Sequence, residues 1–130
     1  MSKKKGIRRV LLVVAILLVG IGVTAYTNIQ GINSEVKSIQ VQNIDLSKVS
    51  DGVYTGEYYF KDIVSAKVEV TVKDNKILNI ALVEHKNGLG GKAESITNSV
   101  ISAQSLDVDV VSGATASSTI ILKAIEDAFR

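Results

Sequence analysis

Residues 66–84 read AKVEVTVKDNKILNIALVE, and this stretch decides the fold. Apolar and polar side chains alternate strictly over 66–73, which is typical of a strand with one face in a core and the other in water. Asp74 and Asn75 predict a short turn, and residues 76–84 predict the returning strand. The stretch therefore predicts an antiparallel hairpin with one buried face.

The segments on either side of the hairpin extend this pattern. Residues 53–61 (VYTGEYYFK) are rich in aromatic side chains and predict a first strand. Residues 92–104 and 117–129 both repeat apolar side chains at intervals of three and four, which predicts two helices. Residues 108–111 predict a short extended piece between them. The expected fold class is α+β, a small antiparallel sheet with helices packed on one face.

The N-terminal region predicts export. Residues 10–25 (VLLVVAILLVGIGVTA) carry no charge, and as a helix they span about 24 Å against a hydrocarbon core of about 30 Å. Five of the fifteen basic residues lie in the first nine positions, and all thirteen acidic residues come from Glu35 on. The positive-inside rule then predicts a single transmembrane helix with its N-terminus inside and the rest of the chain outside the cytoplasm. The alternative is a signal peptide with Val23-Thr24-Ala25 as its cleavage site, which would leave a secreted domain.

These patterns divide the chain into four parts. The predicted parts are a basic cytoplasmic tail at 1–9, a transmembrane anchor at 10–26, a linker or stalk at 27–50 and a folded domain at 51–130. Beyond Tyr26 there are ten basic and thirteen acidic residues, a net charge of 10 − 13 = −3. A mildly acidic domain lacks the basic footprint of nucleic-acid binding, so no nucleic-acid partner is expected.

The content of metal-binding and redox-active side chains narrows the function further. The chain has no cysteine, which excludes disulfide scaffolds, iron–sulfur clusters and thiol catalysis. His85 is the single histidine, so a metal site with several histidines cannot form within one chain. We therefore expect no metal site.

Residues 109–118 (DVVSGATASS) are the strongest candidate for chemistry. Five hydroxyl side chains fall within 112–119, whereas one is enough to cap a helix. Gly113 and Ala114 keep the bulk low beside Thr115, and the N–H groups at the start of the following helix suit a phosphate. The G-x-S-x-G elbow of serine hydrolases is absent. The pattern therefore predicts a place where a phosphate is held or attached, with a simple helix cap as the alternative.

Residues 85–92 (HKNGLGGK) are a second candidate. They are not a P-loop, because Lys86 stands where that motif needs its first glycine and no serine or threonine follows Lys92. Two interpretations stay open. The glycines either make a tight connection between a strand and a helix, or they let backbone N–H groups approach a flat or anionic ligand. His85 on its own is more typical of a surface histidine at a strand end.

Together these segments resemble the small FMN-binding domain of sodium-pumping quinone reductases, related electron-transport complexes and exported flavoproteins. In that family a threonine in an Asp-x-x-Ser/Thr-Gly-Ala-Thr motif carries FMN through a phosphoester bond, and residues 109–115 (DVVSGAT) match every fixed position. DGVYTGEYY at 51–59, the hairpin, the glycine loop and AQSLDVDVVSGATASS at 103–118 appear in family order. The resemblance therefore covers most of 51–130.

The resemblance implies a set of cofactor-binding residues. Thr115 would carry the covalent FMN, flanked by Ser112, Gly113 and Ala114, and a separate magnesium-dependent flavin transferase would read Asp109 while moving FMN from FAD. The residues implied on the ring side of the flavin are His85, Asn87, Gly88, Leu89 and Gly90. The loop lacks the Glu, Thr and Pro of the His-x-Glu-Thr-Pro-Gly-x-Gly pattern common in the pump subunits.

Three tyrosines complete the candidates. Aromatic side chains in a strand commonly pack on their neighbours, so we expect strand packing, with stacking on the flavin as the alternative. The tyrosines concerned are Tyr54, Tyr58 and Tyr59.

The function implied is that of an extracytoplasmic, membrane-tethered electron carrier with covalent FMN. It would take electrons from a membrane dehydrogenase or a quinol and pass them to a downstream acceptor. It would be a redox carrier or an oxidoreductase subunit rather than a stand-alone enzyme, and no catalytic residue is assigned. Two alternatives remain: a subunit of a multi-subunit, ion-pumping quinone reductase, and a non-redox envelope binding module.

Overall fold

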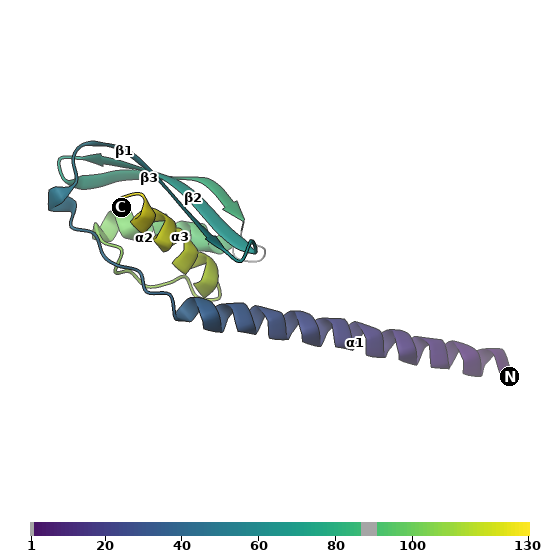
Figure 1. Cartoon of the computed structure of the whole chain (residues 1–130). Coiled ribbons are helices and arrows are strands. Elements are labelled where there is room, and N and C mark those ends of the chain that lie inside the picture. The colour runs from purple at the N-terminus through teal and green to yellow at the C-terminus, as the bar shows by residue number, and fades with distance from the viewer. Residues whose placement is uncertain (1, 87–90) are drawn as a thin grey trace. The chain divides into compact units, whose positions relative to one another are not determined.

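The computed structural model (Figure 1) describes residues 2–86 and 91–130. The chain divides into two compact units, residues 1–35 and residues 36–130. The first unit consists of helix α1, which runs from Ser2 to Lys37 and so extends just into the second. Its large apolar side chains from Ile7 to Tyr26 are exposed, and in the described part of the chain it is the one helix long and apolar enough to cross a membrane. The predicted apolar span therefore lies within one continuous helix.

The second unit is built on a three-stranded antiparallel sheet in the order β1-β2-β3. The strands are β1 (Gly52–Phe60), β2 (Val64–Lys73) and β3 (Lys76–Lys86). Asp74 and Asn75 join β2 to β3 with φ angles of 52° and 60°. Two successive residues with positive φ are typical of the tight hairpin turns that match strand twist. The predicted hairpin and first strand are confirmed.

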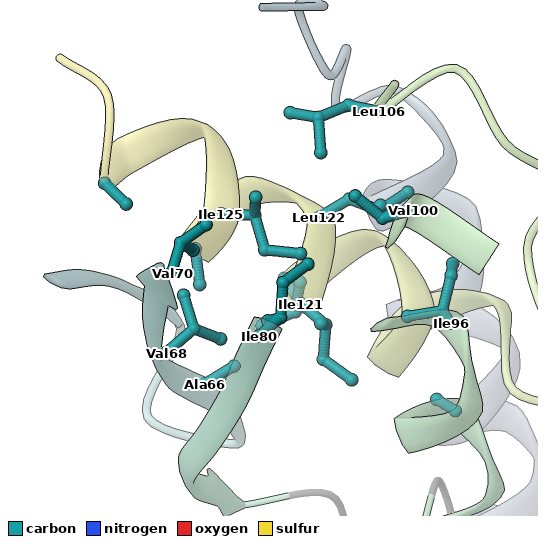
Figure 2. Close-up of a cluster of buried hydrophobic side chains, with 14 of the residues drawn as sticks. Ala66, Val68, Val70, Ile80, Ile96, Val100, Leu106, Ile121, Leu122 and Ile125 are labelled. Atoms are coloured by element: carbon teal, nitrogen blue, oxygen red, sulfur yellow. The ribbon is translucent and has the colours of Figure 1, made fainter. Parts of the chain in front are cut away.

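Helices cover one face of this sheet (Figure 1). They are the 3₁₀ helix η2 (Gly91–Ser95), α2 (Ile96–Ala103) and α3 (Thr115–Asp127). The apolar positions of β2 from Ala66 to Val72 are at most 2% exposed, whereas Glu69 and Lys73 on the other face are exposed. Ile121 and Ile125 of α3 face Val68 and Val70 of β2 (Figure 2). The structure thus confirms the α+β class with helices on one side of the sheet.

Helix α3 lies very close to β1 at Gly56. A Cβ atom added to this buried glycine would lie 2.0 Å from the carbonyl oxygen of Ala124 and 2.4 Å from the nitrogen of Ala128. Because both neighbours are backbone atoms of the helix end, only a glycine permits this approach. Next to it, the rings of Tyr54 and Phe129 pack with their centroids 5.3 Å apart.

The segment before β1 is packed more closely than a linker would be. Val36 is fully buried, and five further apolar side chains pack against the core. These are Ile39, Val41, Ile44, Leu46 and Val49. The compact unit therefore begins at Val36, ahead of the start predicted at Asp51.

A buried carboxylate on α3 holds this segment. Glu126 is 6% exposed, and its Oε2 accepts hydrogen bonds from the backbone nitrogen of Gln42 at 2.9 Å and from Lys123 Nζ at 2.8 Å. Its Oε1 lies 2.5 Å from a guanidinium nitrogen of Arg130. Burial alone would raise the pKa of Glu126, but the hydrogen bonds from Lys123, Gln42 and Arg130 and the charge of Lys123 outweigh burial and lower it. The carboxylate therefore stays ionised and ties residues 40–42 to the end of α3.

The predicted helix over 92–104 is divided between η2 and α2, and Gln104 ends α2 in the left-handed conformation with φ 50°. Its side-chain amide accepts from the nitrogen of Ile77 at 2.7 Å and donates to the oxygen of Ile77 at 2.8 Å, as an extra strand would. Residues 107–111 have no regular secondary structure, so the extended piece predicted at 108–111 forms no strand. The backbone nitrogen of Val111 bonds a serine side chain of α3 instead of a neighbouring strand.

Candidate functional site

A tight turn leads into α3 and presents Thr115 as the first residue of that helix. The turn is closed by a hydrogen bond of 2.9 Å from the nitrogen of Ala114 to the oxygen of Val111. Gly113 has a φ of 77°, a left-handed conformation that favours glycine. Ser112 is exposed and Thr115 is half-buried, so the predicted attachment residue lies at the edge of the protein.

Two of the hydroxyls downstream brace this turn. Ser118 is fully buried. Its Oγ accepts from the nitrogen of Val111 at 3.0 Å and donates to the oxygen of Ala114 at 2.7 Å. Thr119 Oγ1 donates to the oxygen of Thr115 at 3.0 Å. These hydroxyls therefore hold the turn from inside the helix.

The start of α3 has no side-chain cap. Its N-cap residue is Ala114, which is 5% exposed and makes no capping hydrogen bond with its side chain. The first N–H groups of an α-helix have no acceptor within the helix. The helix-cap alternative is therefore not what the structure shows, and this helix end suits a negatively charged group.

Lys92 reaches this turn from the far end of the glycine loop. A Cβ atom added to Gly113 would lie 2.7 Å from Lys92 Nζ and 3.3 Å from its Cε. The lysine side chain thus lies over the glycine two residues before Thr115. In the sequence Lys92 resembles only the lysine of an incomplete P-loop, and no local spacing relates it to Gly113, 21 positions further on (113 − 92 = 21).

His85 lies in β3, where it pairs with Ala66 of β2. Its side chain is 3% exposed, and its Nδ1 lies 3.4 Å from Glu94 Oε1 in η2. The expectation of a surface histidine is therefore wrong, because the His85 side chain is almost fully buried beside Glu94 of η2. The same helix carries Lys92. Helix η2 therefore contacts His85 of β3 through Glu94 and approaches Gly113 through Lys92. Asn87, Gly88, Leu89 and Gly90 lie outside the described residues.

The three tyrosines of β1 have different surroundings. Tyr54 packs on Phe129 and donates to the oxygen of Ser50 at 2.7 Å. Tyr58 packs against the core. Tyr59 is 55% exposed, and the negative charge of Glu57 beside it raises the pKa of its hydroxyl. Tyr54 and Tyr58 thus show the strand packing that was expected, and Tyr59 remains at the surface.

The segment before the turn carries Asp109, whose side chain is exposed. On either side of it this segment forms one wall of a groove of about 340 Å³, and α3 contributes Thr119 and Leu122. The remaining lining residues are Ile39, Val41, Asn43, Leu106, Asp107, Val108 and Val110. Thr119 is four positions, about one helical turn, beyond Thr115. Among residues 2–86 and 91–130, no group of three or more His, Cys, Asp or Glu side chains could hold a metal ion.

Comparison with known proteins identifies the class to which this fold and site belong. Residues 64–130 match the family model described as the FMN-binding domain. The chain belongs to the FMN-binding domain family, which confirms the resemblance drawn from DVVSGAT and its surroundings. Membership supports a flavin-binding role in electron transfer, with FMN as the cofactor.

A curated relative is similar over a longer stretch. The NADH:acrylate oxidoreductase of Vibrio harveyi is 34% identical over 94 residues, which is 68% of this chain and 9% of that protein. This chain therefore corresponds to a small part of a much larger oxidoreductase.

The residues present fit the phosphate end of FMN. Thr115 offers a hydroxyl at the edge of the protein, α3 offers an uncapped N-terminus, and Lys92 adds a positive charge over Gly113. A side chain at position 113 would meet the lysine head that now lies there. The turn thus combines an accessible hydroxyl with groups that suit a bound anion.

Proposed function

We propose that this protein is a membrane-tethered electron-transfer flavoprotein whose FMN is bound covalently through a phosphoester to Thr115. The observation that carries the proposal is the position of Thr115. It is the first residue of an uncapped helix, inside an intact DVVSGAT motif, with Gly113 and Ala114 leaving room before it. A threonine needed only for packing or capping would not require this combination.

The attachment is a phosphoryl transfer in which a separate enzyme supplies the activation. The Thr115 oxygen bonds to the FMN phosphorus of FAD, the pyrophosphate bond to the AMP half breaks, AMP leaves and the hydroxyl proton is released. No oxidant is needed. The chain contributes an accessible hydroxyl and a recognisable loop, and the exposed side chain of Asp109 is available for a magnesium-dependent flavin transferase to read.

Once attached, the flavin supplies the redox chemistry, and the protein positions it and sets its electrostatic surroundings. On the ring side we assign His85 and, by family position, Asn87, Gly88, Leu89 and Gly90. The buried His85 side chain lies beside Glu94, so it is not a freely mobile surface group. Ser112 is exposed in the attachment turn, where the transferase can approach it.

The proposed cellular setting is supported by the apolar helix α1 and the basic residues at its start. The basic N-terminus stays inside, residues 10–26 cross the membrane, and the flavin domain faces the outside. A covalent link suits such a site because flavin lost there cannot readily be replaced. Electrons enter from a membrane dehydrogenase or a quinol and leave to a downstream acceptor. Since the chain spans 9% of its oxidoreductase relative, we propose a carrier role and not the relative's whole reaction.

Production with and without a flavin transferase tests the proposal. The full chain should show flavin fluorescence that survives denaturing electrophoresis only when the transferase is present. Thr115→Ala should abolish it, and Thr55→Ala, which removes an exposed hydroxyl on β1, should retain it. An unmodified wild type in the presence of an active transferase would contradict the covalent link, and a protein that also fails to bind free FMN would favour the non-redox envelope module.

Extraction and protease accessibility test the membrane setting. We expect the chain to stay in the membrane fraction after alkaline extraction and its domain to be digested from outside the cell. A released protein lacking its first residues would instead show that a signal peptide had been cleaved.

A further inference from the structure

We propose that Lys92 is the cationic partner of the FMN phosphate at Thr115 and that Gly113 is required to leave space for its side chain. This inference rests on the proposed attachment at Thr115 and adds a binding residue that the motif does not contain.

The geometry places the lysine at the turn. A Cβ atom added at residue 113 would lie 2.7 Å from Lys92 Nζ and 3.3 Å from Lys92 Cε. Any residue with a side chain at 113 would therefore displace the lysine head. Gly113 also adopts a φ of 77°, so the turn that presents Thr115 and the space for the lysine both depend on the same glycine.

No carboxylate among the described residues competes for the charge of Lys92. In the described part of the chain, Lys92 forms no ion pair with a carboxylate, whereas Lys123 pairs with Glu126 at 2.8 Å and Lys48 with Asp45 at 3.4 Å. A phosphoester keeps a negative charge at every pH at which the protein is folded. A lysine over the turn can donate charge-assisted hydrogen bonds to that charge, and such bonds are roughly twice as strong as neutral ones.

The approach of Lys92 to Gly113 brings together two segments that are separate in the sequence. Lys92 belongs to η2, which follows the glycine loop, and Gly113 belongs to the turn that begins α3. A phosphate between them would connect the two segments that the family resemblance selects. Helix η2, which follows the glycine loop in the sequence, would thus supply a cation to the proposed attachment site.

The test separates the phosphate from the rest of the flavin. The full chain, made without transferase and kept in detergent micelles, is titrated with FMN and with riboflavin, which lacks the phosphate. We expect FMN to bind more tightly than riboflavin. Lys92→Met should weaken FMN binding by about tenfold and leave riboflavin binding unchanged. Lys92→Arg, which keeps the positive charge, should retain most of the FMN affinity. Lys73→Met, on the outer face of the sheet, should change neither affinity. The effect of Lys92→Met should shrink at high salt.

Several outcomes would overturn the inference. One is a wild-type protein that binds FMN no more tightly than riboflavin, including the case in which it binds neither. Another is Lys92→Met lowering both affinities equally, because that indicates a structural role. Covalent labelling distinguishes this failure from failure of the proposed function. If the wild type is labelled at Thr115 but shows no preference for FMN, the proposed function stands and only the role of Lys92 is rejected.

Discussion

Replacing Gly56 with alanine tests the contact that fixes α3 against the sheet. The added Cβ would lie 2.0 Å from the oxygen of Ala124, whereas ordinary contacts begin at 3.4 Å, so β1 and α3 must separate by about 3.4 − 2.0 = 1.4 Å. The obstacle is helix backbone rather than a flexible side chain. The cost therefore falls at the upper end of the usual range for overpacking, about 3 kcal/mol.

Part of this cost is offset in the unfolded chain. Alanine has fewer unfolded conformations than glycine, which contributes roughly 0.5–1 kcal/mol of stability. The net loss is then about 2 kcal/mol, equivalent to a fall in Tm of roughly 8–16 °C for a domain of this size.

The assay is thermal unfolding of the full chain in detergent, followed by near-ultraviolet circular dichroism of the tyrosines. This signal reports the Tyr54–Phe129 packing next to Gly56, whereas the far-ultraviolet signal would be dominated by α1. Thr55→Ala, at the exposed neighbouring position, should change stability by no more than about 0.5 kcal/mol. A Gly56→Ala variant as stable as Thr55→Ala would refute the close approach of α3 and β1.

The remaining predictions concern three other contacts. Glu126→Gln should cost about 1–3 kcal/mol in the same unfolding assay, with the exposed Glu69→Gln as a control that changes little. Because folding lowers the pKa of Glu126 from its ordinary 4.5, its contribution to the free energy of unfolding should be complete above pH 4.5 and should disappear as the pH falls through the lower pKa of the folded state. A stability difference between wild type and Glu126→Gln that does not change with pH would argue against this. Gln104→Ala should cost about 1–3 kcal/mol, because both backbone groups of Ile77 lose their partners; hydrogen exchange at the Ile77 amide should rise with it, and unchanged exchange would contradict the bond. Gly113→Ala should cost about 1 kcal/mol for the left-handed φ and should slow transferase labelling of Thr115; labelling at the wild-type rate would show that the turn tolerates a side chain.

The parts of the fold that the sequence predicts are those written in local patterns. The alternation over 66–73 predicts which face of β2 is buried, because side-chain direction in a strand depends only on the position along it. The same holds for the apolar spacing of α3. The break between η2 and α2 has no such pattern. The lack of a strand at 108–111 has none either, because the backbone nitrogen of Val111 bonds Ser118 of α3, a residue of another element.

The packing of residues 36–50 could not be read from the sequence for a related reason. Its apolar side chains follow neither a strand nor a helix period, so they look like a polar stalk with isolated hydrophobic residues. They become part of the unit through packing against the core and through hydrogen bonds to residues far along the chain, such as Glu126 with the nitrogen of Gln42 and Asn75 with the oxygen of Leu46.

The candidate site was predictable to the extent that a motif defines it. DVVSGAT selects Thr115, and the structure places that residue at an uncapped helix start. The approach of Lys92 to Gly113 and the burial of His85 beside Glu94 join residues from different elements. No spacing along the chain specifies such contacts, and only the folded arrangement reveals them.

The most direct test of the central claim is to locate the flavin on the chain. Trypsin cleaves after Lys92 and after Lys123, so Thr115 falls in a peptide covering residues 93–123. Mass spectrometry of protein made with the transferase should show this peptide heavier by FMN less one water, with fragment ions that assign the added mass to Thr115. The same added mass on another residue, or a peptide that remains unmodified beside an active transferase, would contradict the account.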